Sequence, residues 1–187
     1  HDPTEGVAAA LASVETDIAA IYDFLHGTTI AINTVLERKG ANTALITTKG
    51  FRDVYTMGRN NRPEAFNLEF RRPRPLVPRS LTWEVSARMM ASGDIFAPLI
   101  DDEIEAIGAE LLAADVSSVA VCLLHSYADP GHEQRIGDIL GRVCPDLFIS
   151  LSHDILREYR EYERTSTTAL NAYVGLRVRG YLDRLEG

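Results

Sequence analysis

The sequence has little cysteine, no long apolar run and no excess of positive charge. Its 187 residues include two cysteines, too few for a cysteine-based metal site or for the disulfide framework of a secreted domain. No apolar run reaches the roughly 20 residues that a membrane-spanning helix needs. These absences favour a reducing compartment, so we expect a cytoplasmic protein with no membrane partner.

The charge balance is acidic, with 19 Lys and Arg against 27 Asp and Glu and a formal net charge of −8. Proteins that bind nucleic acids draw their affinity from excess positive charge, so this balance argues against a nucleic-acid partner. The sequence also lacks the two common glycine-rich nucleotide patterns, G-x-x-x-x-G-K-[S/T] and G-x-G-x-x-G. Any functional prediction therefore depends on local segments of the chain.

Apolar spacing predicts strands and helices in alternation along most of the chain. Short apolar runs predict strands at residues 18–25, 43–48, 118–124 and 147–151. Helical periodicity predicts helices after Asp2, after Thr29 and over residues 101–114, 130–143 and 167–185. Strands that alternate with helices imply right-handed crossovers and a mainly parallel sheet.

Two further segments complete the predicted fold. Residues 81–85 alternate as a strand would, and residues 93–97 are expected to return as their hairpin partner. Residues 57–80 are rich in proline and arginine and are expected to cross the molecule without regular structure. The predicted fold class is α/β, a mainly parallel sheet flanked by helices with a small β-hairpin, in one composite domain over residues 1–187.

Ligands of open parallel sheets gather beyond the carboxyl ends of the strands, and three polar segments follow predicted strands. The first is His26-Gly27-Thr28-Thr29. Gly27 allows a ligand to approach the backbone, the threonines offer hydroxyls, and His26 can exchange a proton near neutral pH. Asn33 lies one helical turn beyond Thr29. The structural alternative is a glycine turn with a threonine helix cap and a packed histidine.

The second segment, residues 58–63, places Arg59 and Arg62 on either side of two asparagines. Two guanidinium groups can clamp a carboxylate or phosphate. A solvated loop with incidental arginines is the more common explanation of such a pattern.

The third segment, residues 158–168, is dense in carboxylates, guanidinium groups and hydroxyls. Glu158 and Glu161 are candidate acid and base groups, and Arg164 with Thr165 a candidate anion site. The alternative is a salt-bridged connection that ends in a Thr/Ser helix cap.

The remaining histidines and Cys122 give weaker signals. His125, His132 and His153 lack metal-ligand spacing, so no metal site is expected. Cys122 lies within an apolar strand, which favours core packing over nucleophilic chemistry.

The same segments together resemble the amino-terminal region of the hydantoinase A/5-oxoprolinase family. The resemblance runs in order from about residue 2 to the end of the chain. It is carried by HGTTIAINTVLERKG (26–40), ALITTKGFRDV (44–54), RPRPLVPR (72–79), CLLHSY (122–127), EYREYERTSTT (158–168) and LNAY (170–173).

The resemblance implies an activity that spacing alone does not show. Members include ATP-dependent N-methylhydantoinases, 5-oxoprolinases and subunits of acetone and acetophenone carboxylases, on a fold similar to actin-like ATPases. The implied activity is ring opening of a cyclic amide after ATP activates its carbonyl oxygen, often with a second, B-type subunit. Alternatives within this resemblance are a carboxylase subunit that activates a ketone, or an assembly module that contacts the B-type subunit. A homo-oligomer is also compatible with it.

The resemblance also sets expectations for the site and for nucleotide binding. It implies roles for His26, Glu158 and Glu161 in catalysis, and for a second group in binding substrate or phosphate: Gly27, Thr28, Thr29, Asn33, Arg59, Arg62, Arg164 and Thr165. The chain begins with His1 and lacks the family's aspartate- and glycine-rich phosphate loop. We therefore expect a fragment whose parent enzyme uses ATP and Mg, and which binds neither strongly by itself.

Overall fold

The computed structural model describes residues 3–13, 22–23, 25–59 and 66–186. These residues fall into two compact units, one of residues 1–40 with 174–187 and the other of residues 41–173. Helix α7 (Glu161–Glu186) contributes residues to both. The organisation of residues 1–187 as one domain stays a prediction.

The larger unit is built on a four-stranded parallel sheet with the strand order β2-β1-β5-β6. Its strands are β1 (Thr43–Thr48), β2 (Thr82–Val85), β5 (Ser118–Cys122) and β6 (Phe148–Leu151). Leu45 of β1 aligns with Thr82 on one side and with Ala120 on the other. Because all three pairings are parallel, the carboxyl ends of the four strands share one edge of the sheet.

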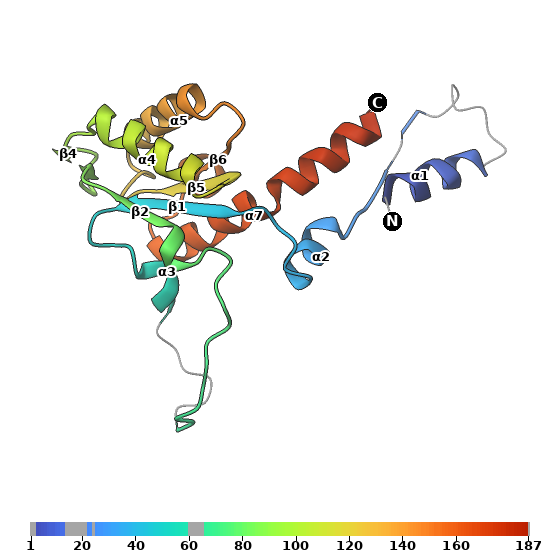
Figure 1. Cartoon of the computed structure of the whole chain (residues 1–187), viewed down its shortest axis with the longest axis horizontal. Coiled ribbons are helices and arrows are strands. Elements are labelled where there is room, and N and C mark those ends of the chain that lie inside the picture. Colours follow the sequence, from blue (N-terminus) through green and yellow to red (C-terminus); the bar gives the residue numbers. More distant parts are fainter. Residues whose placement is uncertain (1–2, 14–21, 24, 60–65, 187) are drawn as a thin grey trace. The chain divides into compact units, whose positions relative to one another are not determined.

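Both faces of this sheet are covered, and every residue of β1 and β5 is buried. Ile46 and Val121 pack on one face with helices α4 (Asp101–Ala113) and α5 (Gly131–Val143) (Figure 1). Leu45 and Ala120 point to the other face, where they pack with Ala169 of α7. Successive residues of a strand alternate between faces, so a strand covered on both sides is apolar at successive positions, as residues 44–46 and 119–122 are. Each fully buried Val or Ile contributes roughly 1.5–3 kcal/mol.

The expected fold class is confirmed, with a correction to the hairpin. Residues 81–85 were expected to pair with residues 93–97, but β2 instead joins the main sheet in parallel beside β1. The hairpin consists of β3 (Arg88–Met89) and β4 (Ile95–Ala97), which pair antiparallel. Trp83 and Val85 share one face of β2 and pack against the core cluster, whereas Glu84 between them points to the other face and is only partly buried.

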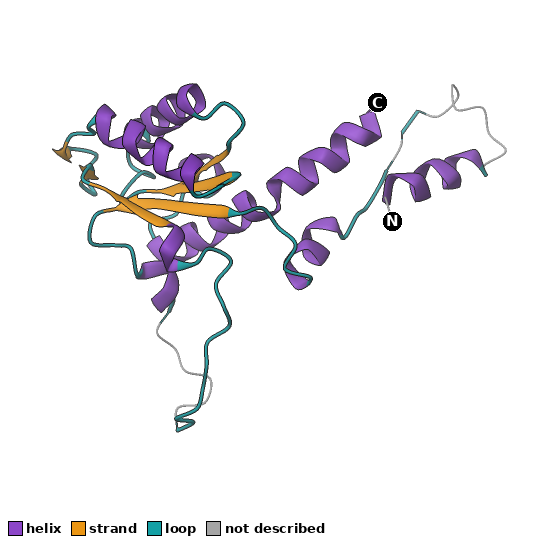
Figure 2. Ribbon diagram, in the orientation of Figure 1, coloured by secondary structure: helices purple, strands orange, loops and turns teal. Residues whose placement is uncertain are grey.

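The connections differ from the expectation at one helix start. Helix α7 begins at Glu161, six residues before the expected residue 167, and its first turn contains Glu161 and Glu163, whose charges favour a helix N-terminus. The short helices α3 (Val54–Met57) and α6 (Ser152–Ile155) follow β1 and β6, and a 3-10 helix (Arg79–Leu81) precedes β2. Residues 66–78 are described without helix or strand (Figure 2).

The smaller unit contains helices α1 (Pro3–Ala12) and α2 (Ile30–Leu36) and the end of α7. The strand expected at residues 18–25 falls mostly outside the described residues, and Tyr22, Asp23 and Leu25, which are described, lie in no strand. Helix α2 stops at Leu36, ahead of the expected Gly40, and Arg38 follows with a φ of 54° in the left-handed region. Within the described ranges, no helix has the length and apolar character needed to cross a membrane.

Candidate functional site

The carboxyl edge of the parallel sheet gathers polar side chains from several elements. Thr48, at the end of β1, accepts a hydrogen bond at its Oγ1 from the Leu124 N–H at 3.0 Å. Glu103 of α4 accepts the Ser86 N–H just beyond β2, at 3.1 Å for each carboxylate oxygen. The segment that follows β5 lies at the centre of this edge, the usual place for a ligand on an open parallel sheet.

Arg164 of α7 is the largest fully buried side chain at this edge, with 0% of its surface exposed. Its Nε donates to the Cys122 Sγ at 3.4 Å and its Nη1 to the Glu158 carbonyl at 3.2 Å. Its Nη2 donates to the Leu123 carbonyl, and its guanidinium lies 5.6 Å from the centre of the Tyr127 ring. Arg164, which is predicted to bind an anion, is therefore a buried cation whose hydrogen bonds go to the end of β5 and to the Glu158 carbonyl.

The acceptors of Arg164 are all uncharged. None of the ion pairs formed by the described residues includes Arg164. A buried charge without a partner of opposite sign is costly and produces a strong local field. No ion pair among the described residues balances the charge of Arg164, which favours an anion or developing negative charge nearby.

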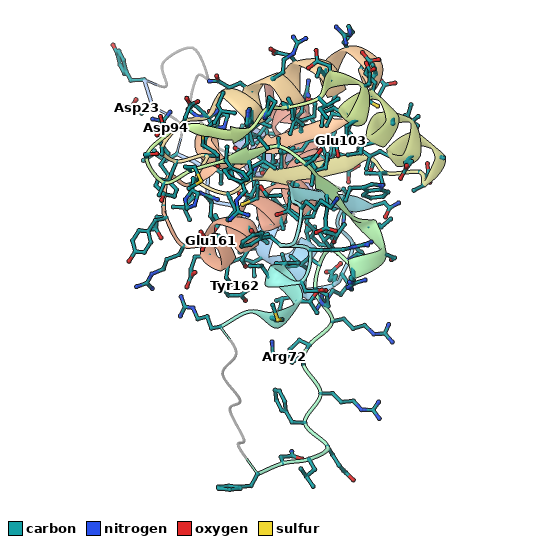
Figure 3. The ribbon with its side chains drawn as sticks, turned by 90° about the vertical axis from the view of Figure 1, so that its left-hand side faces the viewer. Asp23, Arg72, Asp94, Glu103, Glu161 and Tyr162 are labelled. Atoms are coloured by element: carbon teal, nitrogen blue, oxygen red, sulfur yellow. The ribbon has the colours of Figure 1, made fainter. Side chains whose placement is uncertain are left out.

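A small cavity adjoins this cation, with about 10 Å³ open to a water-sized molecule. Thr47, Glu161 and Arg164 line it together with Thr165, whose hydroxyl donates to the Cys122 Sγ at 3.1 Å. Glu161 lies on the first turn of α7 beside Tyr162 (Figure 3). Burial raises the pKa of the Cys122 thiol, although the charge of Arg164 opposes that effect. Cys122 is thus a protonated core residue, as its apolar strand predicted.

Beneath the edge, Glu133 of α5 is a fully buried carboxylate that binds two segments together. Its Oε1 accepts from the Leu123 N–H at 2.8 Å and from the Ser152 hydroxyl at 2.7 Å. Its Oε2 accepts from the His153 N–H at 3.0 Å and from the His153 ring Nδ1 at 2.8 Å. Glu133 thereby fixes the ends of β5 and β6 relative to each other.

Burial alone would raise the pKa of Glu133, but the hydrogen bonds from His153, Leu123 and Ser152 outweigh it and hold that pKa below 4.5. The hydrogen bond to Glu133 in turn raises the pKa of His153 above 6.5, against the effect of burial. Each partner therefore favours the charged form of the other, carboxylate and imidazolium.

Sequence reasoning missed Glu133, although a signal was present. Glu133 shares one face of α5 with Ile136 and Leu140, at spacings of three and seven residues. A single carboxylate inside an apolar stripe must find buried partners or be excluded from the core.

His125 was also not predicted as a site residue. It follows β5 with a φ of 57°, and its Nδ1 lies 3.1 Å from the Tyr127 hydroxyl. Left-handed backbone at a histidine is uncommon and is concentrated at functional positions.

The second predicted segment, residues 58–63, contacts α7 through Arg59, which pairs with Glu163 and not with Arg164. The Arg59 Nε donates to the Glu163 Oε1 at 2.7 Å, in an exposed ion pair. Gly58, with a φ of 60°, lies where a Cβ would be 3.5 Å from the Tyr162 ring, so the turn beside Arg59 favours glycine. Arg62 lies outside the described residues.

Within the third segment, Glu158 differs from its neighbours. Its side chain is exposed and its backbone carbonyl binds Arg164, while Glu161 and Thr165 line the cavity. The structure thus brings Glu161, Arg164 and Thr165 together and places the Glu158 carboxyl group toward solvent.

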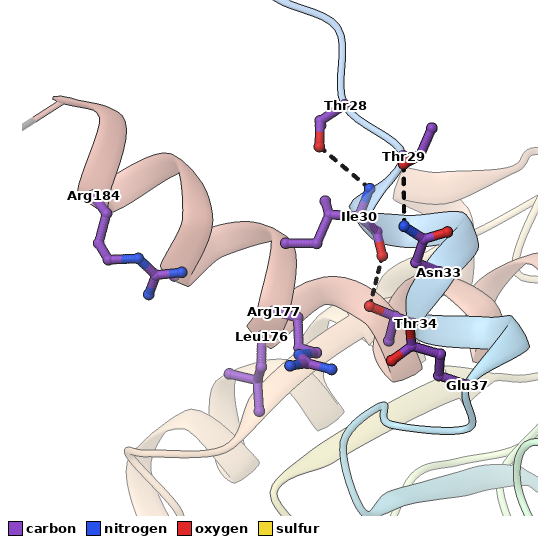
Figure 4. Close-up of a pocket in the computed structure, with 10 residues that line it drawn as sticks. Thr28, Thr29, Ile30, Asn33, Thr34, Glu37, Leu176, Arg177 and Arg184 are labelled. Atoms are coloured by element: carbon purple, nitrogen blue, oxygen red, sulfur yellow. Dashed lines mark hydrogen bonds between the residues drawn. The ribbon is translucent and has the colours of Figure 1, made fainter. Parts of the chain in front are cut away.

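The first predicted segment belongs to the smaller unit. The His26 Nε2 is hydrogen bonded to the Tyr181 hydroxyl of α7. The Thr29 Oγ1 accepts from the Asn33 amide at 3.2 Å, and the Thr28 Oγ1 accepts from the Ile30 N–H at 3.3 Å. Thr28, Thr29 and Asn33 line an open groove whose other wall is α7 (Figure 4). Gly27 is exposed, and a Cβ there would meet nothing within 4 Å.

The fold and this polar edge define an α/β protein with a covered parallel sheet and a candidate ligand site at the carboxyl ends of its strands. Residues 1–144 match the model of the hydantoinase/oxoprolinase N-terminal region, and the chain belongs to that family. The predicted resemblance is confirmed.

Three relatives show how far the similarity extends. An uncharacterized protein of Methanocaldococcus jannaschii is 38% identical over 183 residues, which cover 96% of this chain and 27% of that protein. The crystal structure of an ATP-dependent caprolactamase from Pseudomonas jessenii superposes with a TM-score of 0.85 at 28% identity, over 98% of this chain and 27% of that one. A nucleotide-free acetone carboxylase structure gives a TM-score of 0.76 at 31% identity, over 84% of this chain and 24% of that one. The chain spans about a quarter of the length of these relatives.

Proposed function

We propose that this chain is the amino-terminal part of a cytoplasmic, ATP-dependent hydrolase that opens a cyclic amide such as a hydantoin or a lactam. Membership of the hydantoinase/oxoprolinase family and similarity to a caprolactamase support this class of reaction. The observation that carries the proposal is the buried charge of Arg164 at the carboxyl edge of the sheet, which forms no ion pair with a described residue.

Amide hydrolysis needs help at the carbonyl oxygen, because an amide is a poor electrophile. In the proposed reaction one ATP and two water molecules are consumed. ADP, phosphate and the ring-opened acid are formed, which is an amino acid from a lactam and an N-carbamoyl amino acid from a hydantoin. Negative charge develops on the oxygen atoms of the reacting groups. A preorganised cation in a site that excludes water stabilises such charge far better than the same cation in bulk water.

Each candidate residue has a place in this proposal. Arg164 supplies the positive charge, Thr165 borders the cavity, and Glu161 is the candidate acid or base beside it. Glu158 and Arg59 border the same end of α7, and His26 with the threonine turn belongs to the smaller unit. That the His26 turn and Arg164 frame one substrate or phosphoryl site in the parent enzyme stays a prediction, as does the use of Mg with ATP.

The test uses the full-length parent enzyme. Arg164→Met removes the charge and keeps much of the volume, and His26→Ala removes the imidazole. Each is expected to lower ATP-coupled turnover at least about tenfold while circular dichroism stays native. Arg160→Gln, on an exposed arginine one turn away, is the matched control. Near-normal turnover of a folded Arg164→Met enzyme would remove Arg164 from the site.

A carboxylase subunit that activates a ketone is the second candidate, favoured by the similarity to acetone carboxylase. The hydrolase and the carboxylase are distinguished by whether hydantoin, 5-oxoproline or caprolactam stimulates ATP hydrolysis more than acetone does.

A third candidate is an assembly module that contacts a B-type subunit, since the caprolactamase relative is named as an alpha subunit. Co-purification of the 187-residue chain with that subunit supports the module, and gel filtration of the chain alone tests for a homo-oligomer.

A further inference from the structure

His125 has an uncommon backbone conformation that the end of a helix does not explain. Three described residues other than glycine have a positive φ, namely Arg38 at 54°, Asp115 at 53° and His125 at 57°. Arg38 and Asp115 each lie two residues beyond the last residue of a helix, α2 and α4 respectively, where chains commonly turn left-handed. His125 instead follows strand β5, so its conformation needs another reason.

Hydrogen bonds on both sides of His125 hold the chain in this conformation. Before it, the Leu124 N–H donates to the Thr48 Oγ1 at 3.0 Å. After it, the buried Ser126 hydroxyl donates to the Leu123 carbonyl at 3.2 Å. A left-handed conformation is unfavourable for a residue with a Cβ and persists only where the surrounding structure imposes it. The fold therefore fixes the position of His125 although the local backbone conformation is unfavourable.

One nitrogen of the His125 ring is held and the other is available. The ring is partly buried, its Nδ1 lies 3.1 Å from the Tyr127 hydroxyl, and the two rings meet edge to face with their centres 5.7 Å apart. Nε2 has no hydrogen-bond partner among the described residues. When the ring is protonated both nitrogens are donors, so Nδ1 donates to the Tyr127 oxygen and Nε2 can deliver a proton to a ligand.

This ring lies next to the charged part of the carboxyl edge. The Tyr127 ring that meets His125 also lies against Arg164, whose guanidinium is 5.6 Å from its centre. Residues 123–124, directly before His125, line the small cavity together with Glu161 and Arg164. A group that can exchange a proton and a buried cation therefore occupy the same end of the sheet.

A proton donor meets a need of amide hydrolysis that Arg164 cannot meet. A guanidinium stabilises negative charge but does not give up its proton in proteins. An amide nitrogen that leaves without a proton would leave as a strongly basic anion, so a donor at this nitrogen lowers the barrier. Histidine gains and loses a proton near neutral pH and is the side chain most often used for this transfer.

We propose that His125 is the proton donor to the ring nitrogen when the cyclic amide opens, and that Tyr127 is the positioning residue that orients its ring. The inference rests on the proposed function, which supplies the reaction. Water adds to the activated carbonyl carbon, the C–N bond breaks, and the electron pair of that bond goes to the nitrogen. The nitrogen takes the proton from the His125 Nε2, and the imidazole recovers the proton that the added water releases.

Other titratable or charged groups near this segment bear on the design of a test by pH. They come from α5, α6, α7 and the turn itself: Glu133, His153, Glu161, Arg164 and Asp129. Histidine is the side chain that ordinarily titrates near neutral pH, so the titration of His153 must be separated from that of His125. Deprotonation of His153 lowers stability, because its pKa is raised by the hydrogen bond to Glu133. Circular dichroism at each pH therefore separates unfolding from loss of the proton donor.

The test follows ATP-coupled turnover of a cyclic amide against pH in the full-length parent enzyme. Asparagine is well tolerated in left-handed backbone but does not titrate, so His125→Asn is expected to fold and to lower kcat at least about tenfold. The reaction needs the protonated ring, so turnover of the unchanged enzyme is expected to fall as pH rises beyond neutrality. His125→Asn is expected to lose this alkaline limb. Tyr127→Phe removes only the hydroxyl and is expected to lower kcat by a smaller factor, about threefold or more.

Two further variants separate proton transfer from a structural role. His132→Asn is the matched control, since His132 is a partly buried histidine of α5 outside the cavity lining, and it is expected to keep both turnover and the alkaline limb. Glycine suits left-handed backbone better than histidine, so His125→Gly is expected to keep or raise Tm while its turnover falls as in His125→Asn. A lower Tm with unchanged turnover in His125→Gly would show a structural role and overturn the proposal.

Failure of this inference is distinguishable from failure of the proposed function. If no cyclic amide stimulates ATP hydrolysis by the unchanged full-length enzyme, the hydrolase is rejected and the proton donor with it. If a cyclic amide does stimulate it, normal turnover of a folded His125→Asn enzyme, or an alkaline limb that persists in this variant, would retain the hydrolase and reject His125 as its proton donor.

Discussion

Glu133 shows at the scale of a single residue how a buried charge is made tolerable. Its carboxylate accepts hydrogen bonds from two backbone N–H groups, a hydroxyl and an imidazole, so both oxygens are fully used. A buried charge satisfied in this way fixes its neighbours in one arrangement, whereas removal of one partner leaves the others unpaired. Both backbone polar groups of Leu123 are hydrogen bonded to buried charged side chains, because its N–H donates to Glu133 and its carbonyl accepts from Arg164.

The pair of Glu133 and His153 predicts a pH dependence of stability. The folded-state pKa of His153 lies above 6.5, so its contribution is complete below pH 6.5 and is lost as pH rises through the raised pKa. The folded-state pKa of Glu133 lies below 4.5, so its contribution is present above pH 4.5 and is lost as pH falls through the lowered pKa. Around the pair, Asp154 favours the charged form of His153 and Arg157 opposes it.

The expected result is a fall in the free energy of unfolding as pH rises above 6.5, measured by urea denaturation. His153→Asn keeps a hydrogen-bond donor near Glu133 but cannot titrate, so it is expected to flatten that part of the profile. His132→Asn is the control, because burial lowers the pKa of His132 and its effect on the profile has the opposite sign. An unchanged slope in His153→Asn would contradict the assignment.

At the scale of elements, the contact between α4 and α5 depends on a residue without a side chain. A Cβ on Gly108 of α4 would lie 2.9 Å from the Val143 Cγ2 and 3.4 Å from the Cys144 Sγ. Real Cβ atoms essentially never approach another atom to 2.9 Å, so the two helices can pack at this distance only because residue 108 is glycine.

Gly108→Ala is therefore expected to lower the free energy of unfolding by about 1–3 kcal/mol, since the added methyl group forces the helices apart. Gly141→Ala in α5 is the matched control, because a Cβ there would meet nothing within 4 Å. The control is expected to be neutral or to stabilise the protein by up to about 1 kcal/mol through helix propensity. Equal effects of the two substitutions in urea denaturation would show that packing at Gly108 is unimportant.

At the scale of the whole molecule, the two buried apolar clusters belong to one unit, whereas Val174 and Tyr181 are buried in the other. All members of the two buried clusters, on either face of the parallel sheet, lie between residues 41 and 173. The larger unit therefore has its own core on both faces of its sheet, which is the usual condition for independent folding.

A chain of residues 41–173 is expected to unfold cooperatively, with a Tm within about 5 °C of that of the 187-residue chain. The reason is that truncation removes no member of either core cluster. Differential scanning calorimetry of the two chains provides the measurement. Loss of a cooperative transition in the shorter chain would show that its stability depends on residues outside the unit.

Elements with a strong local signal could be predicted from the amino-acid order alone. Residues 43–48 form β1 as expected, because a run that is apolar at successive positions suits a strand covered on both faces. The family resemblance likewise required no coordinates. Arg164 and Thr165 lie at the carboxyl edge of the sheet, where the order of the segments places them, and their role in binding stays a prediction.

Features that depend on partners far away in the sequence emerged with the folded chain. The pairing of β2 with β1 joins residues about 37 apart in sequence, as Leu45 and Thr82 illustrate, and alternation alone does not name a strand's neighbour. Glu133 is tolerated in the core because Leu123 and His153, ten and twenty residues away, both donate hydrogen bonds to its carboxylate. The groove required α2 and the end of α7, more than 130 residues apart, to form two walls. Local periodicity specifies which face of an element is apolar, but the partner of that face is chosen by packing across the whole chain.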